Sequence, residues 1–252
     1  MKSVKKYFYE IAEEKEDEAY MVAKRLVETL FFQMSKQSTK FCNDIFCDLP
    51  YAYTERRLDS VLLPTLSKMC NSIVLTEYPV NRNQQEDSSV GRIDYWCIYE
   101  GYSFVIELKQ SYDNIRTEHT KKDKLTERWQ EMIKQLDSVK KEIQGFEEKT
   151  NGVIRLGLHI ITSRDKEENV NNHKERFDRK MIEKIAERLR TDIGKTTPRR
   201  KPDIIICWKI PQNIVEKGAK WGCVFPGLWA VAKIYAPISH KGMKSRKKVD
   251  SI

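Results

Sequence analysis

Residues 91–110, GRIDYWCIYEGYSFVIELKQ, constrain the fold of this chain more than any other stretch. Two runs rich in aromatic and β-branched residues, 92–99 and 102–109, are typical of β-strands, and Glu100-Gly101 lies between them. Glycine at the second position of a two-residue connection is typical of a tight hairpin turn. The pattern therefore predicts a β-hairpin.

A two-residue turn fixes which residues of the two strands face each other. Tyr99 then faces Tyr102, and counting outward places Asp94 directly opposite Glu107. Opposed residues of an antiparallel pair project to the same side of the sheet with Cβ atoms about 5 Å apart, and Lys109 projects to that side as well. We therefore expect Asp94, Glu107 and Lys109 to share one face.

The turn leaves a second register open. Glutamate fits poorly at a first turn position that requires a positive φ, and a three-residue loop with a glycine bulge would pair Asp94 with Ile106 instead. A four-residue loop would keep Asp94 opposite Glu107. The other face of the second strand is wholly apolar, which favours packing against a helix layer; it consists of Tyr102, Phe104, Ile106 and Leu108.

Two carboxylates this close indicate a bound cation. Without one they repel, and one of them keeps its proton. A divalent metal neutralises both and takes their oxygens at about 2.1 to 2.5 Å.

An Asp on one strand and Glu-Leu-Lys closing the next resembles the PD-(D/E)xK nuclease superfamily, which includes restriction endonucleases, RecB-like and phage exonucleases, and Holliday-junction resolvases. The resemblance covers about the middle of the chain, and Ile93 stands where the motif has its proline. It implies that Asp94 and Glu107 bind Mg²⁺ or Mn²⁺, that the Leu108 carbonyl adds a ligand, and that Lys109 holds or activates the attacking water. The alternative is an ordinary hairpin with a charged, solvated face, because ExK triplets are common.

The resemblance also implies two further site residues from flanking helices. A helix before the first core strand often supplies another acidic ligand, and Glu55 is the candidate, with Glu77 as its rival. The alternative for Glu55 is a solvent-facing residue favoured by the helix dipole. RecB-like nucleases carry a Gln on the helix after the hairpin, a role we transfer to Gln135; the alternative is a boundary residue that hydrogen-bonds water.

The charge balance favours a polyanionic partner. The chain has 46 Lys and Arg against 37 Asp and Glu, a net charge of +9. We expect the phosphate contacts to come from the hairpin, the following helix and the loop TTPRRK, for which a solvated surface turn is the alternative; the candidates are Arg92, Arg128, Arg199, Arg200 and Lys201. DNA is the expected partner, RNA stays open because no residue is identified that reads the 2′ hydroxyl, and a homodimer is compatible with the sequence.

The remaining composition indicates a cytoplasmic protein without a membrane partner. No apolar run approaches the ~18 to 20 residues of a membrane span, and the N-terminus has no signal-like apolar core. The six cysteines are scattered rather than grouped in CxxC pairs, which favours reduced, mostly buried thiols over a zinc ribbon or an iron–sulfur cluster.

Hydrophobic periodicity predicts the remaining elements in chain order. Helices are expected at 5–36, at 53–69 despite Pro64, at 117–145 and around 177–189; strands are expected at 72–80, 155–163, 203–208 and 223–236. His159 is interpreted as a structural residue of an interior strand.

These elements predict an α/β fold with one main domain. With the resemblance, the expectation is a restriction-endonuclease-like three-layer core with a central mixed β-sheet flanked by helices, plus an N-terminal helical segment. The expected division is an N-terminal helical segment at 1–50, the nuclease-like domain at 51–238 and a basic disordered tail at 239–252. The expected function is that of a metal-dependent deoxyribonuclease; the alternative is a catalytically inactive protein of the same fold that binds nucleic acid or a protein partner.

Overall fold

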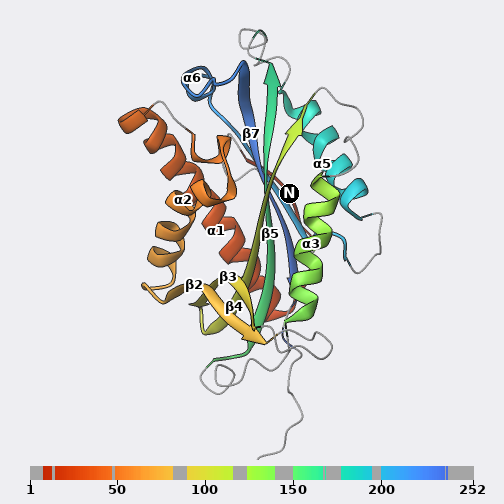
Figure 1. Ribbon diagram of the computed structural model, residues 1–252. Coiled ribbons are helices and arrows are strands. Elements are labelled where there is room, and N and C mark those ends of the chain that lie inside the picture. The colour runs from red at the N-terminus through yellow and green to blue at the C-terminus, as the bar shows by residue number, and fades with distance from the viewer. Residues whose placement is uncertain are drawn as a thin grey trace, which may run out of the picture.

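A seven-stranded sheet with helices on both faces forms the fold (Figure 1). The computed structural model describes residues 8–12, 15–46, 49–81, 90–115, 124–139, 150–166, 168, 177–194, 200–235 and 237. Arg199 and the tail at 239–252 lie outside these residues. None of the described helices is long and apolar enough to cross a membrane, and none of the described cysteines forms a disulfide.

The sheet is mixed, with the strand order β1-β6-β7-β5-β4-β3-β2. The strands are β1 Phe8–Ala12, β2 Val74–Asn81, β3 Val90–Tyr99, β4 Tyr102–Asn114, β5 Val153–Lys166, β6 Ile204–Lys209 and β7 Cys223–Tyr235. The β4–β5 pair is parallel and all the other pairs are antiparallel. The interior place predicted for the strand at 155–163 is confirmed, because β5 lies between β4 and β7.

The helices divide between the two faces of the sheet. Figure 1 shows α1 and α2 on one side and α3 and α5 on the other. The helices are α1 Glu18–Phe41, α2 Glu55–Met69, α3 Lys124–Ser138, α5 Arg179–Gly194 and the short α6 Gln212–Lys217; η1 Cys42–Phe46 is a π-helical turn and η2 Pro50–Ala52 a 3₁₀ turn. Each side has its own apolar core, and sheet residues contribute to both. The buried stripe of α1 belongs to the core on the side of α1 and α2.

The helix predicted at 5–36 is wrong at its N-terminal end. Residues Phe8–Ala12 form β1, which pairs antiparallel with β6, with Phe8 opposite Trp208. The helix begins only after Asp17, whose side chain accepts a hydrogen bond from the Tyr20 N–H and so caps the first turn. Aromatic and β-branched residues in FYEIA suit a strand, and a partner strand almost two hundred residues away supplies the pairing.

Two other predicted helices are confirmed with different limits. Proline inside a helix commonly bends or breaks it, yet α2 runs unbroken from Glu55 to Met69 across Pro64. The helix predicted at 117–145 is described as α3 from Lys124 to Ser138, and most of the rest of that range lies outside the described residues. The short helix α6 was not predicted.

The two faces of β4 differ in chemistry as the alternating pattern predicts. Tyr102, Phe104, Ile106 and Leu108 are buried in the core under α1 and α2. Val105, Glu107 and Lys109 project to the opposite side, toward α3. Glu107 and Lys109 therefore lie on the α3 side of the sheet and are buried.

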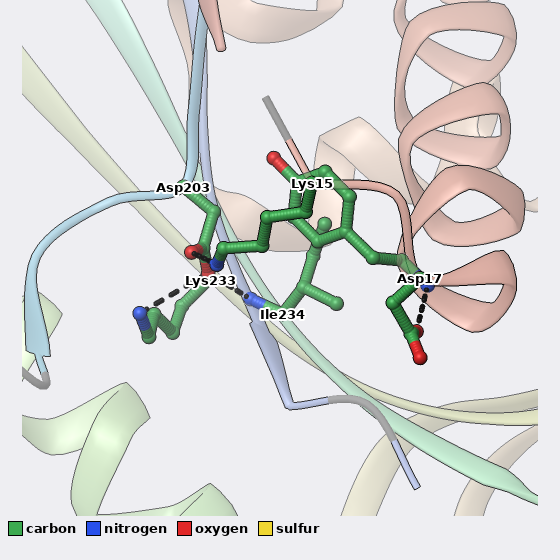
Figure 2. A network of polar contacts seen from close by, with 6 residues as sticks. Lys15, Asp17, Asp203, Lys233 and Ile234 are labelled. Atoms are coloured by element: carbon green, nitrogen blue, oxygen red, sulfur yellow. Dashed lines mark hydrogen bonds and ion pairs between the residues drawn. The ribbon is translucent and has the colours of Figure 1, made fainter. Parts of the chain in front are cut away.

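A buried acid anchors the segment before α1 to the start of β6 and the end of β7 (Figure 2). One carboxylate oxygen of Asp203 is 2.6 Å from the Lys15 Nζ, and the other is 3.1 Å from the Lys233 Nζ. The second oxygen also accepts a hydrogen bond from the Ile234 N–H at 2.8 Å. One carboxylate thus joins the start of β6, the end of β7 and the approach to α1.

Candidate functional site

The β3–β4 hairpin has the two-residue turn predicted from its sequence. Glu100 and Gly101 both have positive φ, 46° and 79°, as a type I′ turn requires. The register runs from Tyr99 opposite Tyr102 to Tyr95 opposite Ile106, so the three-residue alternative is excluded. Arg25 of α1 holds Glu100 in this unfavourable conformation, since its guanidinium lies 2.5 and 3.1 Å from one carboxylate oxygen.

Where β3 and β4 separate, carboxylate side chains accept the hydrogen bonds that the backbone of β3 would otherwise accept from β4. Beyond the Tyr95–Ile106 pair, the Leu108 N–H donates to the Asp94 Oδ2 at 2.6 Å. Two residues further, the Gln110 N–H donates to the Glu55 Oε2 at 3.0 Å. We call this stretch of β4 the open edge. Because the N–H and C=O of one strand residue point to the same side, the Leu108 carbonyl also faces the open edge.

Asp94 and Glu107 lie together beneath α3. Glu107 is only 1% exposed, and its side chain shares a hydrogen bond with Asp94. Burial raises the pKa of Asp94; the Leu108 N–H and the charge of Lys109 act in the opposite direction, and the charge of Glu77 adds to the rise. Two carboxyl groups in hydrogen-bond contact form a pair that a divalent cation could neutralise.

Glu55 approaches the same edge from α2. Burial raises the pKa of Glu55, the charge of Lys109 lowers it and the charge of Asp94 raises it again. Glu77 instead has an exposed side chain, a positive φ of 51° and an ion pair with Arg92 at 3.8 Å. Of the two rivals, Glu55 is therefore the one that lines the open edge.

Lys109 is a buried cation close to Asp94 and Glu55. Its side chain is 8% exposed, and its charge acts on Asp94, Glu55 and His159. His159 stands beside it as its β5 partner in the parallel register.

His159 has the surroundings of a structural residue, as its sequence position predicts. Burial, together with the charges of Lys109 and Arg128, lowers the pKa of His159 to about 3, so the imidazole stays neutral at physiological pH. Its Nε2 lies 2.7 Å from the Ser111 Oγ, and its ring stacks on Trp129 of α3.

Helix α3 carries two of the site residues predicted from the sequence, Arg128 and Gln135, on this side of the sheet. The charge of Arg128 lowers the pKa of both Glu55 and His159, which places its guanidinium near the open edge, although it also pairs with Glu131 at 3.1 Å. The Gln135 Oε1 is buried without a hydrogen-bond partner among the described residues. A buried carbonyl oxygen of this kind is suited to receiving a donor.

The other basic candidates are more distant or outside the described residues. Arg92 has an exposed side chain and pairs with Glu77. Arg200 lies against α3, where its carbonyl accepts from the Trp129 Nε1 at 3.0 Å and its guanidinium is 3.5 Å from Asp137. Lys201 is exposed. Of the loop residues that the structure describes, Arg200 is thus held against α3 and Lys201 is exposed.

Two contributors to the open edge were missed in the sequence. Gln110 donates through its Nε2 to the Tyr51 carbonyl at 2.9 Å, while its Oε1 is buried without a partner in the described part of the chain. Tyr51 belongs to η2, directly before α2, so Gln110 joins β4 to the segment that carries Glu55. In the sequence, Gln110 directly follows Glu-Leu-Lys. The alternation of the strand places it on the same face as Leu108 but does not indicate a role at the open edge.

The donor set fits a hard cation with few protein ligands. Within the described residues, no group of three His, Cys, Asp or Glu side chains is placed to hold a metal ion by itself. Mg²⁺ is commonly held by one or two carboxylates and keeps several waters. Asp94, Glu107 and the Leu108 carbonyl meet that requirement, with Glu55 beside them.

Comparisons with known proteins supply no further assignment. A function therefore has to come from the geometry and chemistry of the chain itself. Neither the models of known protein families, nor the curated proteins, nor the solved structures contain a significant match to this chain.

Proposed function

We propose that this protein is a metal-dependent deoxyribonuclease that hydrolyses DNA phosphodiester bonds. The observation that carries the proposal is a pair of hydrogen-bonded acids beside a strand carbonyl and a buried amine at the open edge of β4, with a third carboxylate two strand residues further along. Those residues are Asp94, Glu107, Glu55, Leu108 and Lys109. An ordinary hairpin with a solvated charged face is hard to reconcile with the burial of Glu107 and Lys109.

The order of elements supports the same proposal. A hairpin carries the acids, α3 crosses over, and β5 returns parallel to β4. This succession is the one expected of the restriction-endonuclease-like core that the PD-(D/E)xK resemblance implies. The fold class and the position of the acids thus both support the proposed nuclease, and the activity itself is inferred from the residues of the site.

The residues divide the chemistry between them. Asp94, Glu107 and the Leu108 carbonyl would hold Mg²⁺ or Mn²⁺, with Glu55 as the additional acid. A bound ion of this kind supplies charge stabilisation at the phosphate and lowers the pKa of a coordinated water. Lys109 would hold the attacking water by a hydrogen bond and offset the negative charge that develops as the bond to the 3′ oxygen breaks. Arg128 and Gln135 would contact the phosphate from α3.

A substrate panel tests the activity. The protein is incubated with linear, circular, single-stranded and branched DNA and with RNA, with Mg²⁺, with Mn²⁺ or with a chelator. Cleavage that requires the divalent ion and disappears in Asp94→Ala is expected. Cleavage that survives Asp94→Ala would assign the activity to another site or to a contaminant, and cleavage of RNA alone would replace the substrate.

The pH dependence of metal uptake is a second expected result. Because burial raises the pKa of Asp94 and Glu55, these carboxyls keep their protons to a higher pH than usual, and a metal has to displace them. Affinity for Mn²⁺ measured by calorimetry should therefore fall as the pH is lowered from neutral toward about 4, the ordinary carboxyl range.

Two variants give this measurement its control. Asp94→Asn should abolish the uptake, whereas Glu183→Gln, which changes an exposed acid of α5, should leave the affinity and its pH profile unchanged. Uptake that does not depend on pH would contradict the assignment of the ligands.

The second candidate function is a protein of this fold that binds nucleic acid without cleaving it. One observation favours it: Asp94 and Glu55 already accept backbone hydrogen bonds, and no three acidic, histidine or cysteine ligands gather in the described residues. A pure binding protein should show no Mn²⁺ uptake that depends on Asp94 and Glu107, so the same calorimetry separates the two functions.

A further inference from the structure

A partly exposed group of aromatic and basic side chains lies beside the open edge, and the proposed site does not use it. We call this group the aromatic platform. Its rings are those of Tyr53, Tyr112 and Trp221, and its cations are those of Arg57, Arg164 and Lys220.

The members of the aromatic platform come from four separate segments of the chain. The rings of Tyr53 and Trp221 meet edge to face, with centroids 5.0 Å apart. Arg57 of α2 lies over the Tyr53 ring at 3.7 Å, and the Lys220 Nζ donates to the Tyr53 hydroxyl at 2.6 Å. The Tyr112 hydroxyl of β4 donates to the Tyr53 carbonyl. Contacts between distant segments therefore hold the group together.

Trp221 keeps most of its surface exposed despite its contact with the Tyr53 ring. Its side chain is 70% exposed, the most exposed of the large apolar residues described. It also has a positive φ of 53°, followed by Gly222 at 68°, and Lys220 and Cys223 exchange two backbone hydrogen bonds of 2.9 Å across them. This is a two-residue hairpin turn that favours Asn or Gly at its first position, and a bulky residue with positive φ is unusual there. Such an outlier is a reason to look for a function.

We infer that the aromatic platform binds the unpaired bases of single-stranded DNA. Exposed rings stack on bases, and interleaved cations neutralise the phosphates, which is the combination that single-strand binding surfaces use. The two strands of a duplex cover the faces of their bases, so a stacking surface selects unpaired nucleotides. The net charge of +9 favours the same class of ligand.

The aromatic platform adjoins the candidate active site through two pairs of neighbours. Tyr53 lies two residues before Glu55, and Tyr112 lies two residues after Gln110. Glu55 and Gln110 are themselves hydrogen-bonded at the open edge. Two residues of a strand span about 7 Å, so bases stacked on the platform place the adjoining backbone near the acids. This step, which names a single-stranded substrate, rests on the proposed function; the binding itself does not.

Binding of DNA in a chelator tests the inference without any cleavage. The anisotropy of a labelled oligothymidylate is titrated with the whole protein and with Trp221→Asn. Losing one stacking ring should weaken binding by about 5- to 100-fold. The melting temperature should stay the same or rise, because Asn is favoured at this turn position. Ile73→Asn, which removes an exposed apolar side chain near β2, should bind as the wild type does.

Each other result would overturn the inference. Unchanged affinity in Trp221→Asn, or equal losses for single-stranded and duplex DNA, would show that the ring does not stack on unpaired bases. Tighter binding of single-stranded RNA with the same loss in the variant would replace DNA as the ligand. Because the titration contains no metal, a protein that binds as expected but never cleaves would contradict only the proposed activity.

Discussion

Lys109→Met should lower the rate of DNA cleavage by about 10²- to 10⁴-fold while changing DNA affinity only slightly. Methionine keeps the length and the apolar stem of the side chain, so the buried position stays filled. What is lost is the one buried amine whose charge acts on both Asp94 and Glu55. Single-turnover rates at saturating enzyme measure the effect on chemistry apart from binding.

A matched control separates this role from a general loss of positive charge. Lys68 is an exposed lysine in the last turn of α2, and Lys68→Met removes the same charge away from the open edge. That variant should cleave at the wild-type rate. A Lys109→Met protein that cleaves within about tenfold of wild type would remove the amine from the chemistry, since general acid–base groups contribute more than that.

Asp203→Ala should destabilise the protein by about 3 to 5 kcal/mol. The substitution leaves the Lys233 ammonium, which has 11% of its side chain exposed, without its carboxylate, and it removes the acceptor of the Ile234 N–H (Figure 2). It also releases Lys15 and with it the approach to α1. For a chain of this size the melting temperature should fall by about 6 to 20 °C, measured by thermal unfolding.

The expected loss of stability in Asp203→Ala comes from the burial of the charged groups rather than from the ion pair itself. Glu183→Ala breaks the exposed pair between Arg179 and Glu183 on α5, and it should cost no more than about 1 kcal/mol. Adding Lys233→Met to Asp203→Ala should restore part of the loss, because the stranded charge is then gone. A loss of under about 1 kcal/mol in Asp203→Ala alone would contradict a structural role for this network.

The sequence alone predicted the local part of the hairpin. The glycine at position 101 and the alternation of apolar and charged residues predicted the turn and its register, which the structure confirms as far as Tyr95 opposite Ile106. These inferences use a period and a turn rule that act within about twenty residues of chain. Glu55 was a candidate on a different ground, because the resemblance implies an acidic ligand from the helix before the first core strand.

The remainder depends on pairings that no local pattern specifies. Residues Phe8–Ala12 read as part of a helix because their partner, β6, lies at the other end of the chain. The hydrogen bond between Glu55 and Gln110 joins residues 55 positions apart, and the ion pair that holds Glu100 in its strained turn comes from Arg25 of α1. Trp221 carried no signal, because an exposed ring in a turn has no periodic neighbour.

The separation of β3 and β4 has a consequence for what can enter between them. A split in a sheet normally offers a row of backbone donors and acceptors to which another extended peptide can add itself. Here the Leu108 and Gln110 amides are already taken by Asp94 and Glu55. An intruding peptide would meet occupied donors and two acidic groups, so the split resists strand addition and aggregation.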